Sequence, residues 1–594
     1  MSIARLERVT LLGYCADKDE VLARLQDLGC LHVLPAHSEP AAPGPLPTTS
    51  RAKEALELLL TCPQKRKQRT DERHFDPERV ERRVLDLKER LLALRDERDF
   101  LEKRISDVAV WGQFELPDLS DVAGQRLWFY VVPPHLMARF AETAATWTEV
   151  HRDNRHHYVV VLSETQPEGL PVPRTRTGQM PLEELRVRFE EVELEIEDLE
   201  AERSALTRWC RLLARNVDRL DDRATLEHVS RQTLDREPVF ALLAWIPASR
   251  LPELTRYAEE AGLAVESRAP LPEDDPPTQL ENAPLVSAGE QLVTFYMTPG
   301  YFTWDPSAAI FFSFTVFFAM IVSDAGYALV MALILARLWW RMAKTDIGRR
   351  LRVLFAALTA ATFVYGVLTG STFGIAPAEG SWLARLQLLD LKDSRTMMGL
   401  AVVVGGLHLM LANGIEAWRL RSSARALAPA GWVVALIGGF LAAGGAMDGR
   451  LVLEVTGLGL LAAGGTSVFL FAGAGERLGK RLLQGGLALT NVTKAFGDVL
   501  SYLRLFALGL ATASLAAAFN EMGTQIRGKL PGVGLLLALL VWVIGHTLNF
   551  VLGLASGVIH GLRLNVIEFL DWSLHEEGKV FRPFRRKENL PWNR

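Results

Sequence analysis

Two arginines, Arg504 and Arg563, each interrupt a long apolar stretch in the last fifth of the sequence. The stretches read SYLRLFALGLATASLAAAF (501 to 519) and VWVIGHTLNFVLGLASGVIHGLRLNVIEF (541 to 569). A guanidinium stays protonated at physiological pH, and placing it at a bilayer centre costs about 3 kcal/mol on insertion scales. One interpretation is a snorkelling anchor near a helix end, which nearby acidic residues favour for Arg563. The other is a fixed charge that faces a mobile carboxylate and keeps it ionised.

Small and polar residues recur along the second stretch. At about 100° per residue in a helix they fall within about 100° of one another. They are His546, Asn549, Gly553, Ser556, His560 and Arg563. The pattern predicts a polar seam on a membrane helix, although such residues also occur where membrane helices pack against each other.

The composition divides the chain into two halves. Of the 594 residues, 49% are hydrophobic and 23% charged, which is too apolar for one soluble protein and too charged for a membrane protein alone. Residues 1 to about 290 are rich in Arg, Glu and Asp, whereas 306 to 570 hold long apolar runs separated by short basic loops. The four cysteines form no CxxC pair, which favours a reducing compartment over a zinc site or disulfide framework. With no signal-peptide pattern at its start, the first half is expected to be cytoplasmic.

The second half predicts eight membrane spans. Six are 352 to 375, 397 to 418, 428 to 446, 451 to 473, 488 to 522 and 532 to 567. The segment 306 to 339 follows a cytoplasmic domain and ends in a basic loop, so two short helices are expected there, turning at 323 to 326. Asp324 is expected at that turn, solvated rather than buried. The positive-inside rule places the N-terminal domain and the C-terminus in the cytoplasm. The expected location is a prokaryotic plasma membrane.

The first half predicts two small α/β lobes joined by an antiparallel coiled-coil hairpin. Apolar residues alternate steps of three and four over 78 to 110 and again over 182 to 222, with Arg98 and Arg203 each at one seam position. The tip is expected to form strand, helix (135 to 147) and strand. His151, His156 and His157 favour a solvated strand edge over a metal site. The expected limits are a cytoplasmic domain 1 to 290 (proximal lobe 1 to 60 with 225 to 270, arms 78 to 110 and 182 to 222, distal lobe 112 to 180, linkers 38 to 50 and 268 to 286), a transmembrane domain 291 to 575 and a tail 576 to 594.

SYLRLFALGLA and HGLRLNVIEF resemble the arginine-bearing helices of subunit a, or subunit I, of V-type and V/A-type rotary ATPases. YFTWDPS (301 to 307), TGSTFG (369 to 374) and KVFRPF (579 to 584) are also similar to this family. The chain departs from it at Ser323 and Ala328, where the family usually has glycine, and in lacking an acidic residue before Gly374. Eukaryotic relatives carry His and Glu where this chain has Thr512 and Gly553, so only the arginines carry over.

The resemblance implies a mainly α membrane protein that acts as the stator subunit of a proton- or sodium-translocating rotary ATPase. It implies partners: a proteolipid c-ring, peripheral stalk subunits of the E/G type, a central-stalk socket subunit and the lipid bilayer. Arg504 and Arg563 would separate two ion half-channels. Candidate lining residues are His546, Asn549, Ser556 and His560 on the far side, and Asp498, Ser501 and Glu568 on the cytoplasmic side.

No cofactor, metal, nucleotide or nucleic acid is expected. GAGERLGKR (473 to 481) lacks the spacing and the final Ser/Thr of a phosphate-binding loop, so the chain is not expected to be catalytic by itself. The alternatives are a secondary transporter or channel with a cytoplasmic sensing domain, and a scaffold that tethers a complex to the membrane. The two halves of the membrane domain show no internal repeat, a common feature of transporters, and this counts against the transporter alternative.

Overall fold

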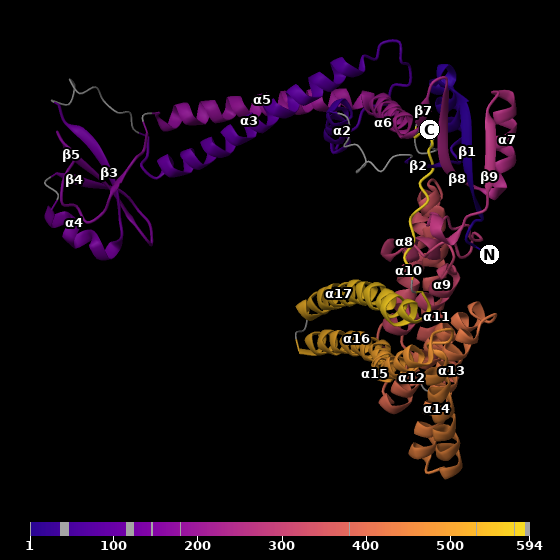
Figure 1. Ribbon diagram of the computed structural model, residues 1–594. Coiled ribbons are helices and arrows are strands. Elements are labelled where there is room, and N and C mark those ends of the chain that lie inside the picture. The colour runs from indigo at the N-terminus through magenta and orange to yellow at the C-terminus, as the bar shows by residue number, and fades with distance from the viewer. Residues whose placement is uncertain are drawn as a thin grey trace. The chain divides into compact units, whose positions relative to one another are not determined.

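The computed structural model describes residues 2–35, 47–113, 124–143, 146–178, 180–378, 380–529, 532–574 and 576–587. The chain divides into two compact units (Figure 1). One comprises Met1–Ser38 with Gln232–Arg585, and the other Glu39–Arg231 with Arg586–Arg594. Most of the predicted linker 38 to 50 lies outside the described residues. The first unit therefore holds both an α/β lobe and the membrane helices.

The lobe of the first unit is one antiparallel sheet built from two remote parts of the sequence. Its order is β2-β8-β1-β9, with β7 paired to β8. β1 pairs with β8 along its whole length, from Leu6 opposite Pro247 to Tyr14 opposite Val239. The elements are β1 (Leu6–Tyr14), α1 (Lys18–Leu28), β2 (His32–Leu34), β7 (Leu234–Arg236), β8 (Val239–Pro247), α7 (Leu251–Glu260) and β9 (Ala264–Arg268).

An ionic cluster fastens the chain after β9 back to the sheet. The carboxylate of Asp274 accepts two hydrogen bonds from Arg268, both of 2.7 Å, and one of 2.5 Å from Arg8 on β1. The Arg268 guanidinium, helped by the Leu271 amide, holds the pKa of Asp274 well below its usual range. Ionised Asp274 thus links β1 and β9 to the segment that leads to the membrane helices.

The C-terminal segment lies against this lobe. The Thr278 amide donates to Lys579 O (2.7 Å), and the Phe584 amide donates to Leu31 O (2.6 Å). The Arg582 amide donates to His32 Nδ1 (2.8 Å). Burial lowers the pKa of His32, and the positive charges of Arg582 and Lys579 lower it further. The neutral imidazole is therefore the form that holds the segment.

The second unit contains the predicted antiparallel helical hairpin. α3 (Pro77–Ala109) packs against α5 (Leu182–Leu206), and α6 (Cys210–Gln232) continues the returning arm. Seam residues such as Leu101, Val108, Leu185 and Val192 are buried together. A further helix of this unit, α2 (Pro47–Leu60), packs on α3.

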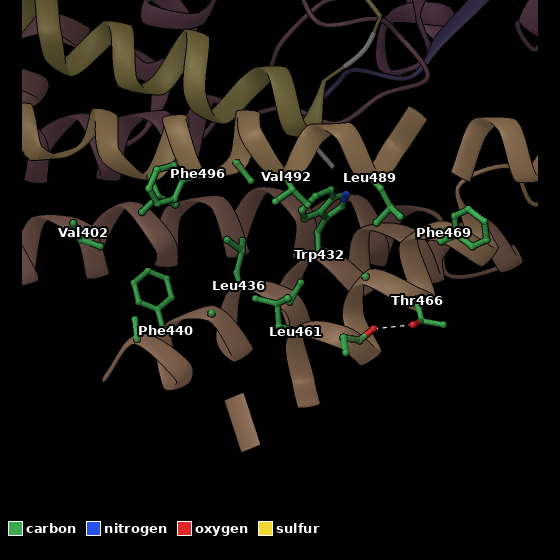
Figure 2. A pocket seen from close by; sticks show the side chains of 17 residues that line it. Val402, Trp432, Leu436, Phe440, Leu461, Thr466, Phe469, Leu489, Val492 and Phe496 are labelled. Atoms are coloured by element: carbon green, nitrogen blue, oxygen red, sulfur yellow. Dashed lines mark hydrogen bonds between the residues drawn. The ribbon is translucent and has the colours of Figure 1, made fainter. Parts of the chain in front are cut away.

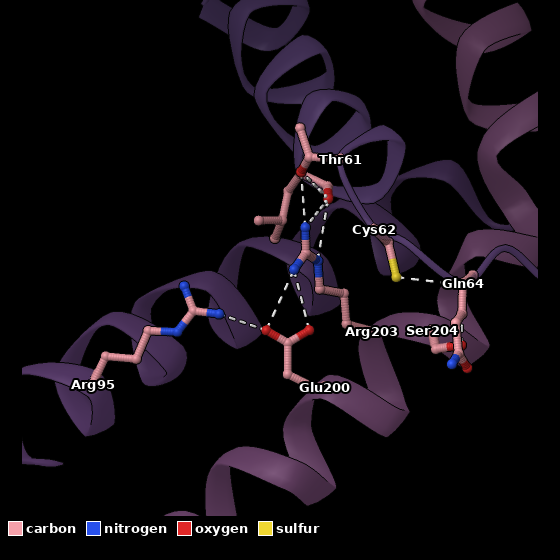
Figure 3. A network of polar contacts seen from close by, with 8 residues as sticks. Thr61, Cys62, Gln64, Arg95, Glu200, Arg203 and Ser204 are labelled. Atoms are coloured by element: carbon pink, nitrogen blue, oxygen red, sulfur yellow. Dashed lines mark hydrogen bonds and ion pairs between the residues drawn. The ribbon is translucent and has the colours of Figure 1, made fainter. Parts of the chain in front are cut away.

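The seam arginine Arg203 is buried and its guanidinium is fully engaged (Figure 3). It donates to Leu58 O and Thr61 Oγ1, each at 2.8 Å, and pairs with Glu200 at 3.1 Å. The accepting carbonyl lies at the C-terminal end of α2, where the helix dipole favours a cation. Arg203 therefore holds α2 on the hairpin.

The distal lobe differs from the prediction in one element. Its strands are β3 (Arg126–Val132), β4 (Trp147–Arg152), β5 (His157–Ser163) and β6 (Arg174–Thr175), with α4 (Met137–Thr143). The helix predicted over 135 to 147 ends at Thr143, and a strand follows it. Every residue of β4 is exposed, so this edge strand lacks the alternation that marks a half-buried strand. His157, predicted on a solvated edge, is instead buried and bonds Glu149 at 2.7 Å.

The membrane helices agree with the eight predicted spans. Seven helical spans of the described chain are long and apolar enough to cross a bilayer, and the 16-residue α9 is an eighth apolar helix. The helices are α8 (Ser287–Tyr296), α9 (Ser307–Val322), α10 (Ala325–Met342), α11 (Asp346–Thr369), α12 (Ser394–Arg419), α13 (Leu427–Asp448), α14 (Leu451–Phe471), α15 (Leu478–Ser501), α16 (Leu503–Lys529), α17 (Val533–Arg563) and α18 (Asp571–Ser573). α9 contacts α8, α11, α16 and α17, and it is the most deeply buried of these helices.

Glycines let α13 and α14 approach closely. A Cβ at Gly438 would lie 2.4 Å from the backbone nitrogen of Leu461, so a larger residue there would force the helices apart. Beside this pair, residues of α12 to α15 line an open cavity of about 820 Å³ (Figure 2). Its lining is almost entirely carbon, and the hydroxyl of Thr466 donates to Ala462 O within its own helix. We call it the α12–α15 cavity.

Candidate functional site

The two arginines lie at the same end of an antiparallel helix pair. Arg504 is the second residue of α16, and Arg563 is the last residue of α17. The helices pack side by side (Figure 1). Trp542 contacts Gly523 at one level, and Gly553 lies opposite Thr512 at another, as an antiparallel pair requires. Residues separated by 59 positions in the sequence are thereby brought to one end of the pair.

Both arginines also lie at interruptions of regular helix. α15 ends at Ser501, and the side chain of Tyr502 at the junction is fully buried, with its hydroxyl 2.7 Å from His408 Nδ1. After Arg563 the chain continues as a π-helical stretch, Leu564–Leu570. Such stretches occur frequently at functional sites. Arg504 therefore follows a buried break between α15 and α16, and Arg563 lies where α17 passes into the π-helical stretch.

Neither guanidinium group forms an ion pair with a carboxylate among the residues that the structure describes. Arg504 is half-buried, and its Nη1 is buried without a hydrogen-bond partner, whereas Arg563 is exposed. Both charges act on the carboxylate of Glu568, which is 2% exposed and whose Oε2 also lacks a hydrogen bond. Free guanidinium donors next to a buried acid could bind and stabilise a further carboxylate.

The other residues predicted near this end have different surroundings. His560 is half-buried, is acted on by both arginines, and has an unpartnered Nδ1. Asp498 accepts a 2.7 Å hydrogen bond from Trp572 and acts electrostatically on Glu568. Ser501 donates to Gly497 O of its own helix at 3.0 Å. Ser556, half-buried on α17, makes no side-chain hydrogen bond to any residue within the described ranges.

His546 and Asn549 belong to a second cluster, built around the hydroxyl of Tyr327 on α10. This oxygen lies 2.9 Å from His546 Nδ1 and accepts a 2.9 Å hydrogen bond from Asn549 Nδ2. His546 Nε2 lies 3.0 Å from Asn520 Oδ1 on α16, and Asn549 Nδ2 also donates to Thr512 O at 2.8 Å. The cluster joins α10, α16 and α17 through polar contacts.

Asp324 lies beside this cluster and is buried, so its predicted solvation is wrong. The turn between α9 and α10 falls where it was predicted, but the carboxylate is only 1% exposed. It accepts hydrogen bonds from the amides of Tyr327 (3.0 Å), Phe373 (2.9 Å) and Gly374 (2.9 Å), and from the Ser371 hydroxyl (2.7 Å). These donors come from the TGSTFG segment after α11 and from the first turn of α10. They replace water as the partners of the charge.

The structure shows the local surroundings of two departures from the family pattern. Ser323 ends α9 with φ of +54°, a left-handed conformation that glycine adopts more readily. Thr512 and Gly553 face each other, since a Cβ at Gly553 would lie 3.6 Å from Thr512 Cγ2. Both positions where eukaryotic relatives have ionisable residues are therefore in one contact between α16 and α17.

The predicted polar seam thus divides into two clusters. His546 and Arg563 are 17 positions apart on one helix, about 25 Å at the α-helical rise. His560, predicted with His546, lies instead in the field of the arginines. Sequence reasoning missed Tyr327, Asn520 and the acceptor role of Asp324. The TGSTFG segment, whose similarity to the family is the only signal the sequence offers there, supplies three of the four donors to Asp324.

The architecture defines an integral membrane protein with a soluble α/β and coiled-coil N-terminal part. No family model matches the chain. It is 29% identical over 466 residues to the V-type ATP synthase subunit I of Chlamydia trachomatis, covering 65% of this chain and 69% of that one. It is 26% identical over 630 residues to V-type ATP synthase subunit I 1 of Treponema pallidum, covering 98% and 100%. A crystal structure titled as the cytoplasmic N-terminal domain of subunit I, homolog of subunit a, of V-ATPase matches 44% of this chain and all of that domain, at 17% identity and a TM-score of 0.22.

The sequence relatives confirm the resemblance to subunit I. The chain is similar to V-type ATP synthase subunit I proteins, and the Treponema pallidum protein matches it over nearly its whole length. This homology covers the helices that bear Arg504 and Arg563.

Proposed function

We propose that the chain is the stationary membrane subunit of a V/A-type rotary ATPase or ATP synthase, and that it supplies the ion path. The homologues support a non-catalytic membrane subunit of such a complex. The observation that supports the proposed ion path is a pair of guanidinium groups at one end of α16 and α17. They form no ion pair with any described residue and lie next to the buried Glu568.

In this mechanism a separate ring of small subunits brings one carboxylate after another to Arg504 and Arg563. A fixed positive charge lowers the pKa of a neighbouring carboxylate, so each ring acid releases its ion there. An ion that enters by one half-channel neutralises the ring acid before it turns into lipid, because an ionised acid is costly in hydrocarbon. The arginines separate entry from exit.

The two clusters are the proposed half-channel linings. The proposed cytoplasmic half-channel would be lined by Glu568, Asp498 and Ser501. His560 would lie at its boundary, beside the arginines. The Tyr327 cluster, with His546 and Asn549, would line the other, and Ser556 lies between the two clusters along α17. A polar lining group is replaceable by water, whereas the permanent charge is not.

The soluble parts are proposed to be cytoplasmic and to hold the complex together. The hairpin and distal lobe would bind peripheral stalk subunits, and the sheet lobe would lie near the central-stalk socket. Cysteines introduced at Lys344 and Ala384 test the sidedness. We expect the first to be labelled from the cytoplasm only and the second from the opposite side only, since one span separates them.

The experiment for the mechanism compares two arginines of the same helix. Arg504→Ala should abolish ATP-driven ion transport by the complex in reconstituted vesicles, with assembly intact. Arg527→Ala, at the exposed far end of α16, should leave transport near the parental rate. His546→Ala should reduce transport without abolishing it. An assembled Arg504→Ala complex that pumps normally would refute the role of the arginine, and a chain that purifies without a ring and an ATPase head would favour the transporter.

A further inference from the structure

A second cavity, on the outer surface of the membrane helices, runs between α10 and α11. Its volume is about 580 Å³. On one wall lie Ala328, Ala332 and Ala336, spaced four residues apart along α10, and on the other Ala356 and Ala360 of α11. The rim carries larger side chains, namely Leu329, Leu335, Trp339, Trp340 and Phe363. We call it the α10–α11 groove.

The groove is suited to hydrocarbon. Its one lining hydroxyl, that of Thr359, donates to Phe355 O at 2.7 Å and so presents no free donor. From Ala328 to Trp340 the wall rises by twelve residues, or about 18 Å. This is close to half of a hydrocarbon core about 30 Å thick. Leu329 (53% exposed), Trp340 (79%) and Phe363 (49%) face outward, as lipid-facing side chains do.

One end of the groove carries uncompensated positive charge. Arg349 and Arg350 form ion pairs with Asp346 and Glu290. The remaining basic residues have no acidic partner in the part of the chain that the structure describes, and they are Arg337, Arg341, Lys344 and Arg352. These residues occupy the last turns of α10, the turn that follows it and the start of α11.

Arg352 connects this charge to the groove. It lies on α11 one turn before Ala356, and its guanidinium carbon is 4.7 Å from the ring centre of Trp339 on the rim. Its Nε is buried and has no hydrogen-bond partner. A guanidinium without an acidic partner among the described residues is therefore held beside Trp339, where the apolar groove meets the basic end, at the level where tryptophans occur in membrane interfaces.

We propose that the α10–α11 groove binds an anionic phospholipid, with one acyl chain along the alanines and the phosphate at Arg352, Arg341 and Lys344. The length fits a chain from one leaflet, and the charge selects an anionic over a zwitterionic head group, because basic residues between membrane helices attract anionic lipid. The α12–α15 cavity provides an apolar comparison, since its lining residues, like those of the groove, are uncharged (Figure 2). The proposal does not depend on the ion path.

The test uses the full chain in phosphatidylcholine vesicles that contain phosphatidylglycerol with a photoactivatable group on its acyl chain. Crosslinked peptides are then mapped by mass spectrometry. We expect adducts on 328 to 363, and matched photoactivatable phosphatidylcholine should label this region several-fold less. Arg341→Gln and Lys344→Gln should each lower labelling about fivefold, since a basic residue near an anionic surface contributes about 1 kcal/mol. Ala360→Phe, which fills the groove, should lower it as well.

Ala443→Phe in the α12–α15 cavity is the matched control and should leave labelling of 328 to 363 unchanged. Equal labelling by the two lipids, or unchanged labelling in both charge variants, would overturn the proposal. So would full competition by glycerol phosphate or inorganic phosphate, because the head group would then bind without the groove. Arg341 and Lys344 are exposed, so their variants decide the question even if Ala360→Phe does not fold.

Discussion

Replacing Asp324 with alanine should release the TGSTFG segment from α10. The carboxylate is buried and accepts four hydrogen bonds, two on each oxygen. One donor is the Tyr327 amide, which makes Asp324 the N-cap of α10, and two others are the amides of Phe373 and Gly374. Alanine offers no acceptor, so the four donors lose their partner and only water entering the vacated space can replace it.

The expected cost follows from these contacts. Loss of an N-cap costs about 1 kcal/mol. The two half-buried amides left without an acceptor cost at most about 1–3 kcal/mol each, which gives at most about 3–7 kcal/mol in total. Asp324→Asn should cost less, because the side-chain amide keeps one oxygen that can accept two of the hydrogen bonds. Its NH2 group would then face the other two donors, which lose their acceptor. Ser371→Ala should cost only about 1 kcal/mol, since it removes a single donor.

Hydrogen exchange of the full chain measures this locally. A loss of about 2 kcal/mol at one amide corresponds to about thirtyfold faster exchange. The amides of Phe373 and Gly374 should therefore lose protection strongly in Asp324→Ala, less in Asp324→Asn and least in Ser371→Ala, with the midpoint of thermal unfolding falling in the same order. Unchanged exchange at both amides in Asp324→Ala would show that the carboxylate does not hold the segment.

Three further predictions concern the soluble parts. Arg203→Ala should cost about 3 kcal/mol and speed hydrogen exchange in α2. Arg98→Ala, at the half-buried seam arginine that bonds Asp99 of its own helix, should not, and equal effects would contradict the role given to Arg203. The folded state lowers the pKa of His32, so the contribution of the imidazole to stability is present above about pH 6.5 and lost as the pH falls. Proteolysis of 577 to 585 should therefore accelerate below that pH. His32→Phe should remove this pH dependence. The pKa of Asp274 is lowered, so its contribution is present above about pH 4 and lost below it; Asp274→Asn should abolish that part of the acid dependence of the unfolding midpoint.

Local periodicity accounts for what the sequence predicted well. The hairpin follows from apolar residues at steps of three and four, and Leu101 and Val192 are buried as that pattern requires. The strand β4 was missed because its six residues are all exposed and the alternation that would mark it is absent. The helix α2 begins next to residues that the structure does not describe, and its packing on α3 depends on contacts that no local pattern contains.

The candidate site was only partly predictable for the same reason. An arginine in an apolar run stands out by itself, so Arg504 and Arg563 could be found from residue type. Burial of Asp324 depends on donors 47 to 50 positions away, and the Tyr327 hydroxyl meets His546 across 219 positions. A polar residue at a predicted turn is usually solvated, and only tertiary partners reverse that expectation.

The contact between the C-terminal segment and the sheet lobe has a consequence for biosynthesis. Strand β1 leaves the ribosome early, but its partner β8 follows more than 220 residues later, and Lys579, Arg582 and Phe584 emerge only after every membrane helix. Until then the carbonyl of Leu31 and the ring of His32 lack the partners they have in the finished fold. A ribosome that stalls within the membrane half thus yields a lobe with an uncovered edge, which gives cellular quality control a feature by which to distinguish interrupted chains from finished ones.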